Sequence, residues 1–262
     1  MRRCWVTIGV LICLGLSAQS VLAGLSLKVV YDNTAYDQNM TPDWGFGCLV
    51  KYGRMTILFD TGKNGTLLLE NFKAMGEDPQ DVDCVVISHN HEDHIGGLLD
   101  FVRVNPKVKV CLADPRPDAV GRLQALGARV HTTPSPRVLC KGVCLTGGMG
   151  HGLKEQALVI NTPAGLILIV GCSHPGILNI VKKTKELFQR PVYLVIGGFH
   201  TMPGSAQGMR QVIHDFKMLG VSKVAPAHCT NEAAKVWFQK AYGQNYIECG
   251  VGREIHFRFR HR

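Results

Sequence analysis

Three histidines and an aspartate lie within one short segment of the chain, residues 88–94, which reads Ser-His-Asn-His-Glu-Asp-His. Neutral imidazole and carboxylate groups are the usual ligands for zinc and similar divalent ions. The segment directly follows the apolar run of residues 84–87, so a strand ending here would project several ligands into one mouth of the fold. A chance cluster of surface histidines is the alternative, but apolar residues flank the segment on both sides. The segment therefore predicts a metal site formed by His89, His91, Asp93 and His94.

Three further histidines lie in short motifs that also follow apolar runs. The motifs are Gly171-Cys172-Ser173-His174, Gly197-Gly198-Phe199-His200 and Ala227-His228-Cys229-Thr230. Because each motif ends a predicted strand, all of them can meet the first cluster at one edge of the fold. A lone histidine such as His200 or His228 is more often structural. Its recurrence beside a predicted ligand cluster favours a shared site.

The elements that must position these motifs follow from hydrophobic periodicity and turn residues. Strands are predicted over residues 25–31, 48–52, 55–59, 82–88, 108–112, 138–145, 157–161, 166–170, 192–196, 224–226 and 254–258. Helices are predicted over residues 67–75, 96–104, 118–126, 176–188, 208–219 and 231–242. Strand-rich segments precede helix-alternating ones, and this order recurs in the second half. The pattern predicts an α/β fold, a four-layer αβ/βα sandwich built as a single domain over residues 24–262.

These motifs resemble a known family. The run His89-Asn90-His91-Glu92-Asp93-His94 is similar to the metal-binding signature of the metallo-β-lactamase superfamily, and Asp60-Thr61-Gly62 resembles its aspartate turn. Tyr31-Asp32-Asn33, the stretch from Gly171 to Ile177, Ile196 to His200, and His228-Cys229-Thr230 resemble one branch, the dihydropterin ribofuranosyl-aminobenzene phosphate synthase-like proteins. The resemblance covers nearly all of the chain after residue 23 and implies the metallo-β-lactamase fold.

The resemblance also implies ligand roles. His89 and His91 would bind a first metal, while Asp93 and His94 would bind a second. His228 resembles the last histidine ligand of that second metal. Asp60 would orient a ligand imidazole instead of binding metal itself, because such a carboxylate fixes the tautomer of the ring.

Two departures from the superfamily pattern bear on the metal. Cys172 stands where a bridging aspartate is common, and the third histidine of the first metal has no clear motif. We assign that role to His174, with His151 as the alternative. A thiolate ligand favours softer ions, so we expect one or two divalent ions, zinc first, with manganese and iron as alternatives. If Cys172 does not bind, the site holds a single ion.

The expected chemistry is hydrolysis. A metal-activated water would attack an ester, lactone, phosphodiester or amide of a small substrate. Asp93 would orient that water and accept its proton, and His200 would hold the substrate or donate a proton to the leaving group. The alternatives are a transferase of the synthase type, a β-lactamase and a non-catalytic metal-binding module.

Composition adds the setting. Arg2 and Arg3, the apolar run from Trp5 to Leu16 and the small residues ending at Ala23 predict a signal peptide over residues 1–23, hence an exported, periplasmic protein without a stable membrane anchor. The formal charge of +9 is spread along the chain, which is typical of solvated charged faces; attraction of an anionic small-molecule substrate is the alternative, and no nucleic-acid motif is present. Among the cysteines, Cys140 and Cys144 are the nearest disulfide candidates, and Cys229 is a buried neighbour of the site or a disulfide partner.

Overall fold

The computed structural model describes residues 24–201 and 206–259, so the predicted leader over residues 1–23 lies outside the described part. In that part, thirteen strands form two sheets. The first sheet has seven strands, in the spatial order β13 (Glu254–Phe257), β1 (Leu25–Tyr31), β2 (Gly47–Tyr52), β3 (Met55–Phe59), β4 (Cys84–Ile87), β5 (Lys109–Leu112) and β6 (Arg129–Thr132). The second has six, in the order β12 (Lys223–Ala227), β11 (Val192–Gly198), β10 (Gly165–Val170), β9 (Leu158–Thr162), β8 (Val143–Leu145) and β7 (Arg137–Cys140).

Each sheet combines a parallel half with an antiparallel half. Strands β3 to β6 run parallel, as do β10 to β12, whereas the remaining neighbours pair antiparallel. The carboxyl ends of parallel strands share one edge of their sheet, which is where α/β folds place ligands. The predicted site motifs follow β3, β4, β10, β11 and β12.

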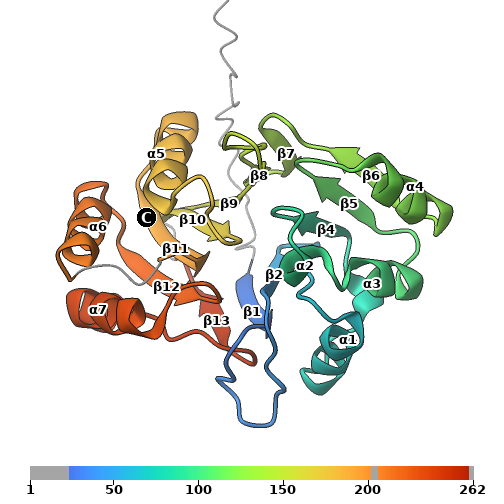
Figure 1. The fold of residues 1–262 in the computed structure, drawn as a ribbon, viewed down its shortest axis with the longest axis horizontal. Helices are drawn as coiled ribbons and strands as arrows, with labels where there is room; N and C mark the ends of the chain where they lie inside the picture. The colour runs from blue at the N-terminus through green and yellow to red at the C-terminus, as the bar shows by residue number, and fades with distance from the viewer. Residues whose placement is uncertain (1–23, 202–205, 260–262) are drawn as a thin grey trace, which may run out of the picture.

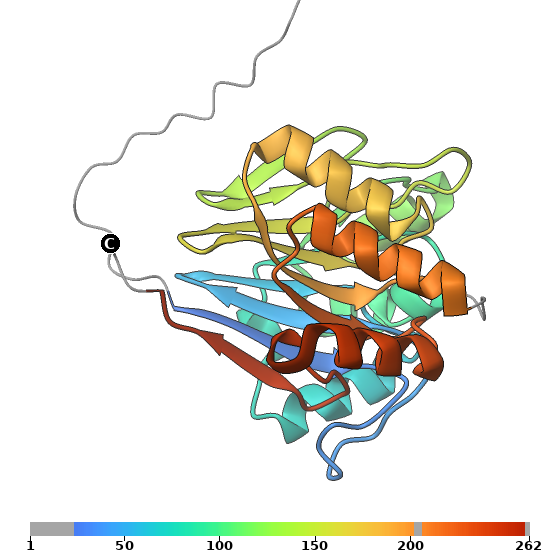
Figure 2. The same cartoon turned by 90° about the vertical axis from the view of Figure 1, so that its left-hand side faces the viewer.

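Helices cover the outer face of each sheet and give the sandwich its four layers (Figure 1). The first sheet carries α1 (Gly65–Ala74), α2 (Glu92–Ile95), α3 (Leu98–Val104) and α4 (Pro117–Ala125). The second carries α5 (Ile177–Phe188), α6 (Ala206–Met218) and α7 (Glu232–Tyr242), which lie side by side in Figure 2. Two 3₁₀ turns, η1 (Pro79–Asp81) and η2 (Gly243–Asn245), complete the described elements. The predicted four-layer α/β sandwich is confirmed.

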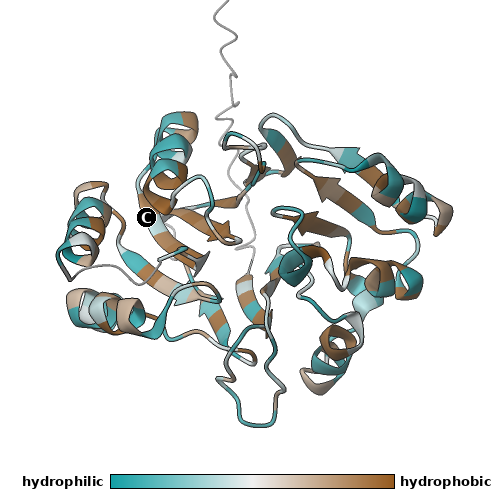
Figure 3. Cartoon of the chain, viewed as in Figure 1, coloured by the Kyte–Doolittle hydropathy of each residue, from teal (hydrophilic) through white to brown (hydrophobic). Residues whose placement is uncertain are grey.

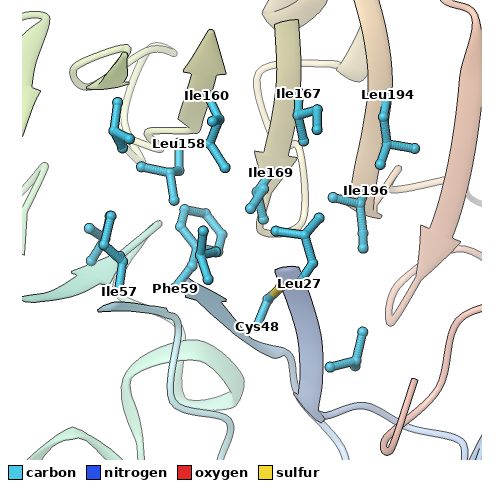
Figure 4. Packing of buried hydrophobic residues seen from close by; sticks show 14 of the residues in the cluster. Leu27, Cys48, Ile57, Phe59, Leu158, Ile160, Ile167, Ile169, Leu194 and Ile196 are labelled. Carbon is cyan, nitrogen blue, oxygen red and sulfur yellow. The ribbon is translucent and has the colours of Figure 1, made fainter. Parts of the chain in front are cut away.

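The main core lies between the two sheets. Figure 4 shows Ile57 and Phe59 of β3 facing Leu158 and Ile160 of β9 and Ile169 of β10, and all five are fully buried. Alternate residues of the strands face this inner layer, and the others pack beneath the helices. Figure 3 shows the resulting pattern, with hydrophobic strands inside and hydrophilic outer faces on the helices. Such burial is the main favourable term in folding.

The structure differs from the expected local structure at four points. Residues 138–145 form the hairpin β7–β8 instead of one strand, because Gly142 turns the chain with a φ of +84°. Strand β6 was not predicted, and the cluster segment begins the separate short helix α2. The expected disulfide between Cys140 and Cys144 is wrong, since both thiols are free. The hairpin register pairs Cys140 with Val143, so the two cysteines are not opposite each other.

Across residues 24–201 and 206–259, we find no helix that combines the length and apolar character needed to cross a membrane.

Candidate metal centre

The histidine motifs meet at one edge of the sandwich. The side chain of His89 lies against those of His91, His94 and His174, with ring centroids 4.7, 4.2 and 4.7 Å from its own. His94 continues the series to His228, whose ring centroid is 4.9 Å away. Residues separated by up to 139 positions thus form one continuous group of rings. The structure therefore brings together the histidines that the sequence singled out.

Two groups of ligand atoms within this cluster have spacings that suit metal binding. Asp93, His94, Cys172 and His228 form the first, and their ligand atoms all lie within 4.8 Å of one another. Within it, Cys172 Sγ is 3.2 Å from His94 Nε2, and Asp93 Oδ2 is 3.0 Å from His228 Nε2. These donors are mixed nitrogen, oxygen and sulfur, the set that zinc accepts.

The second group contains His89, Cys172 and His174. His91 lies beside it, with its Nδ1 atom 3.1 Å from His89 Nε2. The Nε2 atom of His174 is buried and has no hydrogen-bond partner. Because buried polar atoms are almost always paired, this orphaned nitrogen marks a position where a ligand fits. The sequence left two candidates for the third histidine ligand of the first metal, His174 and His151. His151 is exposed and belongs to neither group, so the geometry favours His174.

Asp60 orients two of the ligand rings from behind. Its Oδ2 atom accepts a hydrogen bond from His94 Nδ1 at 2.7 Å and another from the Ser88 hydroxyl at 2.7 Å. Since that hydroxyl donates to Asp60, it accepts from His89 Nδ1 at 2.9 Å. Both rings are thereby held in the tautomer whose Nε2 lone pair faces the cluster, which is how second-shell carboxylates act in metal sites.

Asn33 orients the ring of His228 in a similar way. Its Oδ1 atom lies 2.9 Å from His228 Nδ1 and accepts that N–H, while its amide donates to the His228 carbonyl at 3.1 Å. The sequence reasoning included Asn33 only in a family-like stretch and gave it no role. Its contact joins residues 195 positions apart, so spacing along the chain carries no signal for it.

A buried carboxylate builds the loop that carries Cys172 and His174. Glu155 accepts hydrogen bonds from the backbone N–H groups of Ser173 and His174, both at 2.7 Å. Burial raises the pKa of Glu155 to about 7. Sequence reasoning missed this residue, because a glutamate in a loop looks like an ordinary surface residue.

For His89, His174 and Asp93 the electrostatics favour the protonation states that metal binding needs. Burial first, and then the neighbouring charges of His94 and His174, lower the pKa of His89 well below its ordinary value. Burial also lowers the pKa of His174, to about 4, helped by His200. For Asp93 burial acts against ionisation, but the contact with His228 and the nearby charge of His94 together outweigh it and hold the pKa low. Neutral imidazoles and an ionised carboxylate are the forms that bind divalent ions.

Strained backbone gathers at the same edge. Five described non-glycine residues have positive φ angles, and four of them belong to the site motifs: Asp60 (60°), Ser173 (71°), His200 (45°) and His228 (43°). Such conformations cost about 1–3 kcal/mol each and persist where the surrounding structure enforces them, often at functional sites. His200 is exposed, and its ring centroid lies 4.6 Å from that of His174, which places it at the rim.

A cavity of about 960 Å³ opens beside the cluster. Its lining includes His174 and Pro175 next to the cluster, Met149 and Leu153, and Lys182 of helix α5. Its size suits a small organic molecule. The ring of Trp44, which is 53% exposed, lies 5.0 Å from that of His228.

The four-layer sandwich and the histidine-rich edge together define a protein of the metallo-β-lactamase type. The model of the metallo-beta-lactamase superfamily matches residues 48–172. The 7,8-dihydropterin-6-methyl-4-(beta-D-ribofuranosyl)-aminobenzene-5'-phosphate synthase of Methanocaldococcus jannaschii is 30% identical, and the match covers 77% of this chain and 84% of that protein. The chain belongs to the metallo-beta-lactamase superfamily.

Other similar proteins agree with this assignment. An uncharacterized protein of the same organism is 28% identical, with 87% of this chain and 99% of that protein covered. Among solved structures, Tm1679, a metal-dependent hydrolase of the beta-lactamase superfamily, has a TM-score of 0.74 and 27% identity, and covers 88% of this chain and 98% of its own. Human tRNase Z, short form, has a TM-score of 0.59 at 14% identity, over 88% of this chain and 98% of its own, and shares the fold.

Proposed function

We propose that this protein is a metal-dependent hydrolase that cleaves an ester, lactone, phosphodiester or amide bond in a small molecule. The observation that carries the proposal is the convergence of the two ligand groups at one edge, beside a cavity of about 960 Å³. Divalent ions held there would supply an activated water and a Lewis acid. Zinc fits the mixed nitrogen, oxygen and sulfur donors best, with manganese and iron as alternatives.

Side chains of the protein would carry out proton transfer and substrate binding. Asp93 is partly exposed, and its carboxylate is held by His228 at 3.0 Å, so it is placed to orient a water and accept its proton. His200 stands exposed at the rim beside His174, where an imidazole can donate a proton to a leaving group or hold the substrate. Lys182 would attract an anionic group on the substrate.

The test is a turnover panel of esters, lactones, phosphodiesters and amides, run on zinc-, manganese- and iron-loaded protein. Replacement of His91 by alanine should lower the turnover by at least about 10–100-fold, because loss of a ligand costs no less than loss of its supporting partner. The matched control is His256→Ala, which removes an exposed histidine of strand β13. Turnover that His91→Ala leaves unchanged would place the chemistry elsewhere.

A second candidate is a transferase of the synthase type, favoured by the 30% identity to the M. jannaschii synthase. A transferase forms product only when two co-substrates are supplied together, whereas a hydrolase needs one substrate and water. Assays with each co-substrate alone and with both therefore separate the two candidates. The predicted export over residues 1–23 favours the hydrolase, because an exported protein has little access to cytosolic intermediates.

A further inference from the structure

Two cysteines and a histidine form a third group at the outer side of the cluster: Cys172, His200 and Cys229. Their ligand atoms all lie within 4.8 Å of one another. Cys172 is buried, Cys229 is partly exposed and His200 is exposed, so this side of the cluster opens towards solvent. Sequence motifs gave Cys229 no role in metal binding.

A glycine allows the two cysteines to approach each other. Cys172 follows strand β10 and Cys229 follows β12, while β11 lies between these strands. Gly198 is the last residue of β11, and a Cβ atom there would stand 2.5 Å from Cys229 Sγ and 3.2 Å from Cys172 Cα. Any side chain at this position would therefore push the two cysteines apart. In its absence the Cys229 thiol donates to the Cys172 carbonyl, with the sulfur 3.4 Å from the oxygen.

The backbone conformation also holds His200 close to the two cysteines. Its φ of 45° is strained for a non-glycine residue, and the adjacent Phe199 N–H is fixed by the Thr230 hydroxyl at 3.0 Å. An exposed histidine on a relaxed loop would need neither constraint. The ring is thereby kept near Cys172 and Cys229 and beside His174.

We propose that Cys172, His200 and Cys229 form a further subsite for a thiophilic divalent ion, zinc in the first place. Soft thiolate ligands select such ions over manganese. Tetrahedral zinc with Zn–S bonds of about 2.3 Å holds its donors about 3.5–3.8 Å apart, so side-chain movements of roughly 1 Å would close the observed group. Each thiol would release its proton to solvent as its bond to the metal forms. Two sulfurs and one nitrogen leave a fourth position open on the exposed side.

Cys172 also belongs to both inner groups, with its sulfur 3.2 Å from His94 Nε2. Its thiolate would therefore bridge an ion of the inner cluster and the ion of the new subsite. This goes beyond the proposed hydrolysis, in which the inner ligands hold the metal and His200 acts on the substrate. With an ion in the subsite, His200 would be a metal ligand in place of that role. It predicts a centre with two thiolate ligands in place of one.

Proximity of sulfurs alone does not define such a site. The sulfurs of Cys84 and Cys111 are 3.8 Å apart, yet the two residues belong to no group of three ligand atoms in the described chain. Both are fully buried in the layer between the sheets, where an ion cannot enter. The Cys84–Cys111 pair thus differs from the proposed subsite: it has two sulfurs, but no histidine of the described chain completes a group of three ligand atoms with them, and the pair is not accessible from solvent.

Cobalt(II) reports thiolate ligands directly, because each cobalt–sulfur bond adds to a near-ultraviolet charge-transfer band. Under reducing conditions the cobalt-loaded wild-type protein should show a band that falls by about two-thirds in Cys229→Ser, because two of the three cobalt–sulfur bonds are lost with the subsite ion, and metal analysis should find one fewer ion per chain. His200→Asn should likewise lose one ion. The control Cys140→Ser removes a partly exposed thiol of strand β7 and should change neither reading.

An unchanged band and ion count in Cys229→Ser would overturn the inference. A disulfide would also overturn it, and would appear as two fewer titratable thiols in the wild-type protein as isolated. Circular dichroism of each variant identifies any loss of fold, and His200→Asn provides the test if Cys229→Ser does not fold. These readings do not depend on turnover, so failure of the hydrolysis panel leaves the subsite standing.

Discussion

The carboxylate of Asp60 holds the imidazole of His94 by a hydrogen bond of 2.7 Å, and both side chains are fully buried. Burial works against a charged His94, but the nearby Asp60 carboxylate more than offsets it and raises the pKa of the ring. The bond fixes Nδ1 as the donor, so Nε2 is the atom presented to Cys172 and Asp93. One carboxylate outside the ligand groups thus sets the geometry of the cluster.

Replacement of Asp60 by asparagine should weaken metal binding about 10–100-fold, because supporting partners of ligand histidines have effects of this size. Affinity can be measured by competition with a chromophoric chelator. The matched control Asp118→Asn changes an exposed aspartate of helix α4 and should leave affinity unchanged. Equal affinities in a folded Asp60→Asn protein would show that Asp60 does not orient the ligands.

Glu155→Gln should destabilise the chain by about 1–3 kcal/mol, because one of the two backbone N–H groups at Ser173 and His174 would lose its acceptor inside the protein. Urea unfolding of metal-free protein measures the difference. Glu70→Gln, an exposed position on helix α1, serves as the control. If both variants unfold at the same urea concentration as wild type, the loop does not depend on Glu155.

A second buried carboxylate sets a pH dependence of stability. Glu77 lies 2.9 Å from the Lys28 ammonium and 2.6 Å from that of Lys51. Burial opposes its ionisation, but the two lysine hydrogen bonds prevail, and the pKa of Glu77 is lowered from 4.5. A lowered carboxyl pKa contributes stability that is present above pH 4.5 and is lost as the pH falls through the folded-state value.

Glu77→Gln should therefore lower the free energy of unfolding at pH 7 by about 1–3 kcal/mol. The difference between variant and wild type should shrink as the pH falls below 4.5. Unfolding curves at pH 7 and in the acidic range measure this, and Glu70→Gln is again the exposed control. A difference that stays constant with pH would contradict the assigned role of the two lysines.

Trp44 should report metal binding by its fluorescence. Its ring lies 5.0 Å from that of His228, and its backbone N–H is held by the Asp43 carboxylate at 2.7 Å. Cobalt(II) quenches nearby indoles, so titration should reduce the emission of wild type and of Trp237→Phe, and should have little effect on Trp44→Phe. Quenching that persists in Trp44→Phe would place the ion away from His228.

The apolar runs made most of the fold predictable. Strands such as β10, with six consecutive buried residues, and amphipathic helices such as α5 follow directly from periodicity. Strand β6 was not predictable from the sequence, because its four residues, Arg129–Thr132, include only one aliphatic side chain and lie at a sheet edge. The hairpin β7–β8 depends on Gly142, whose left-handed conformation is visible only in the structure.

Some residues of the candidate site were likewise predictable from the sequence, and others were not. Histidines that end apolar runs were predictable, because strand ends on one edge converge. Asn33 and Glu155 were not, since each acts through contacts formed only after the sheets have packed. Cys229 can approach Cys172 because Gly198, on the strand between them, has no side chain. No local sequence pattern relates Gly198 to Cys229.

The most direct measurement of the central claim is the metal content of the purified protein after reconstitution with zinc, manganese or iron in turn and removal of excess ion. The account predicts at least one tightly bound ion per chain, with a lower content in both His89→Ala and His94→Ala and no change in His256→Ala. Wild-type protein that is folded and binds no zinc, manganese or iron would contradict the account.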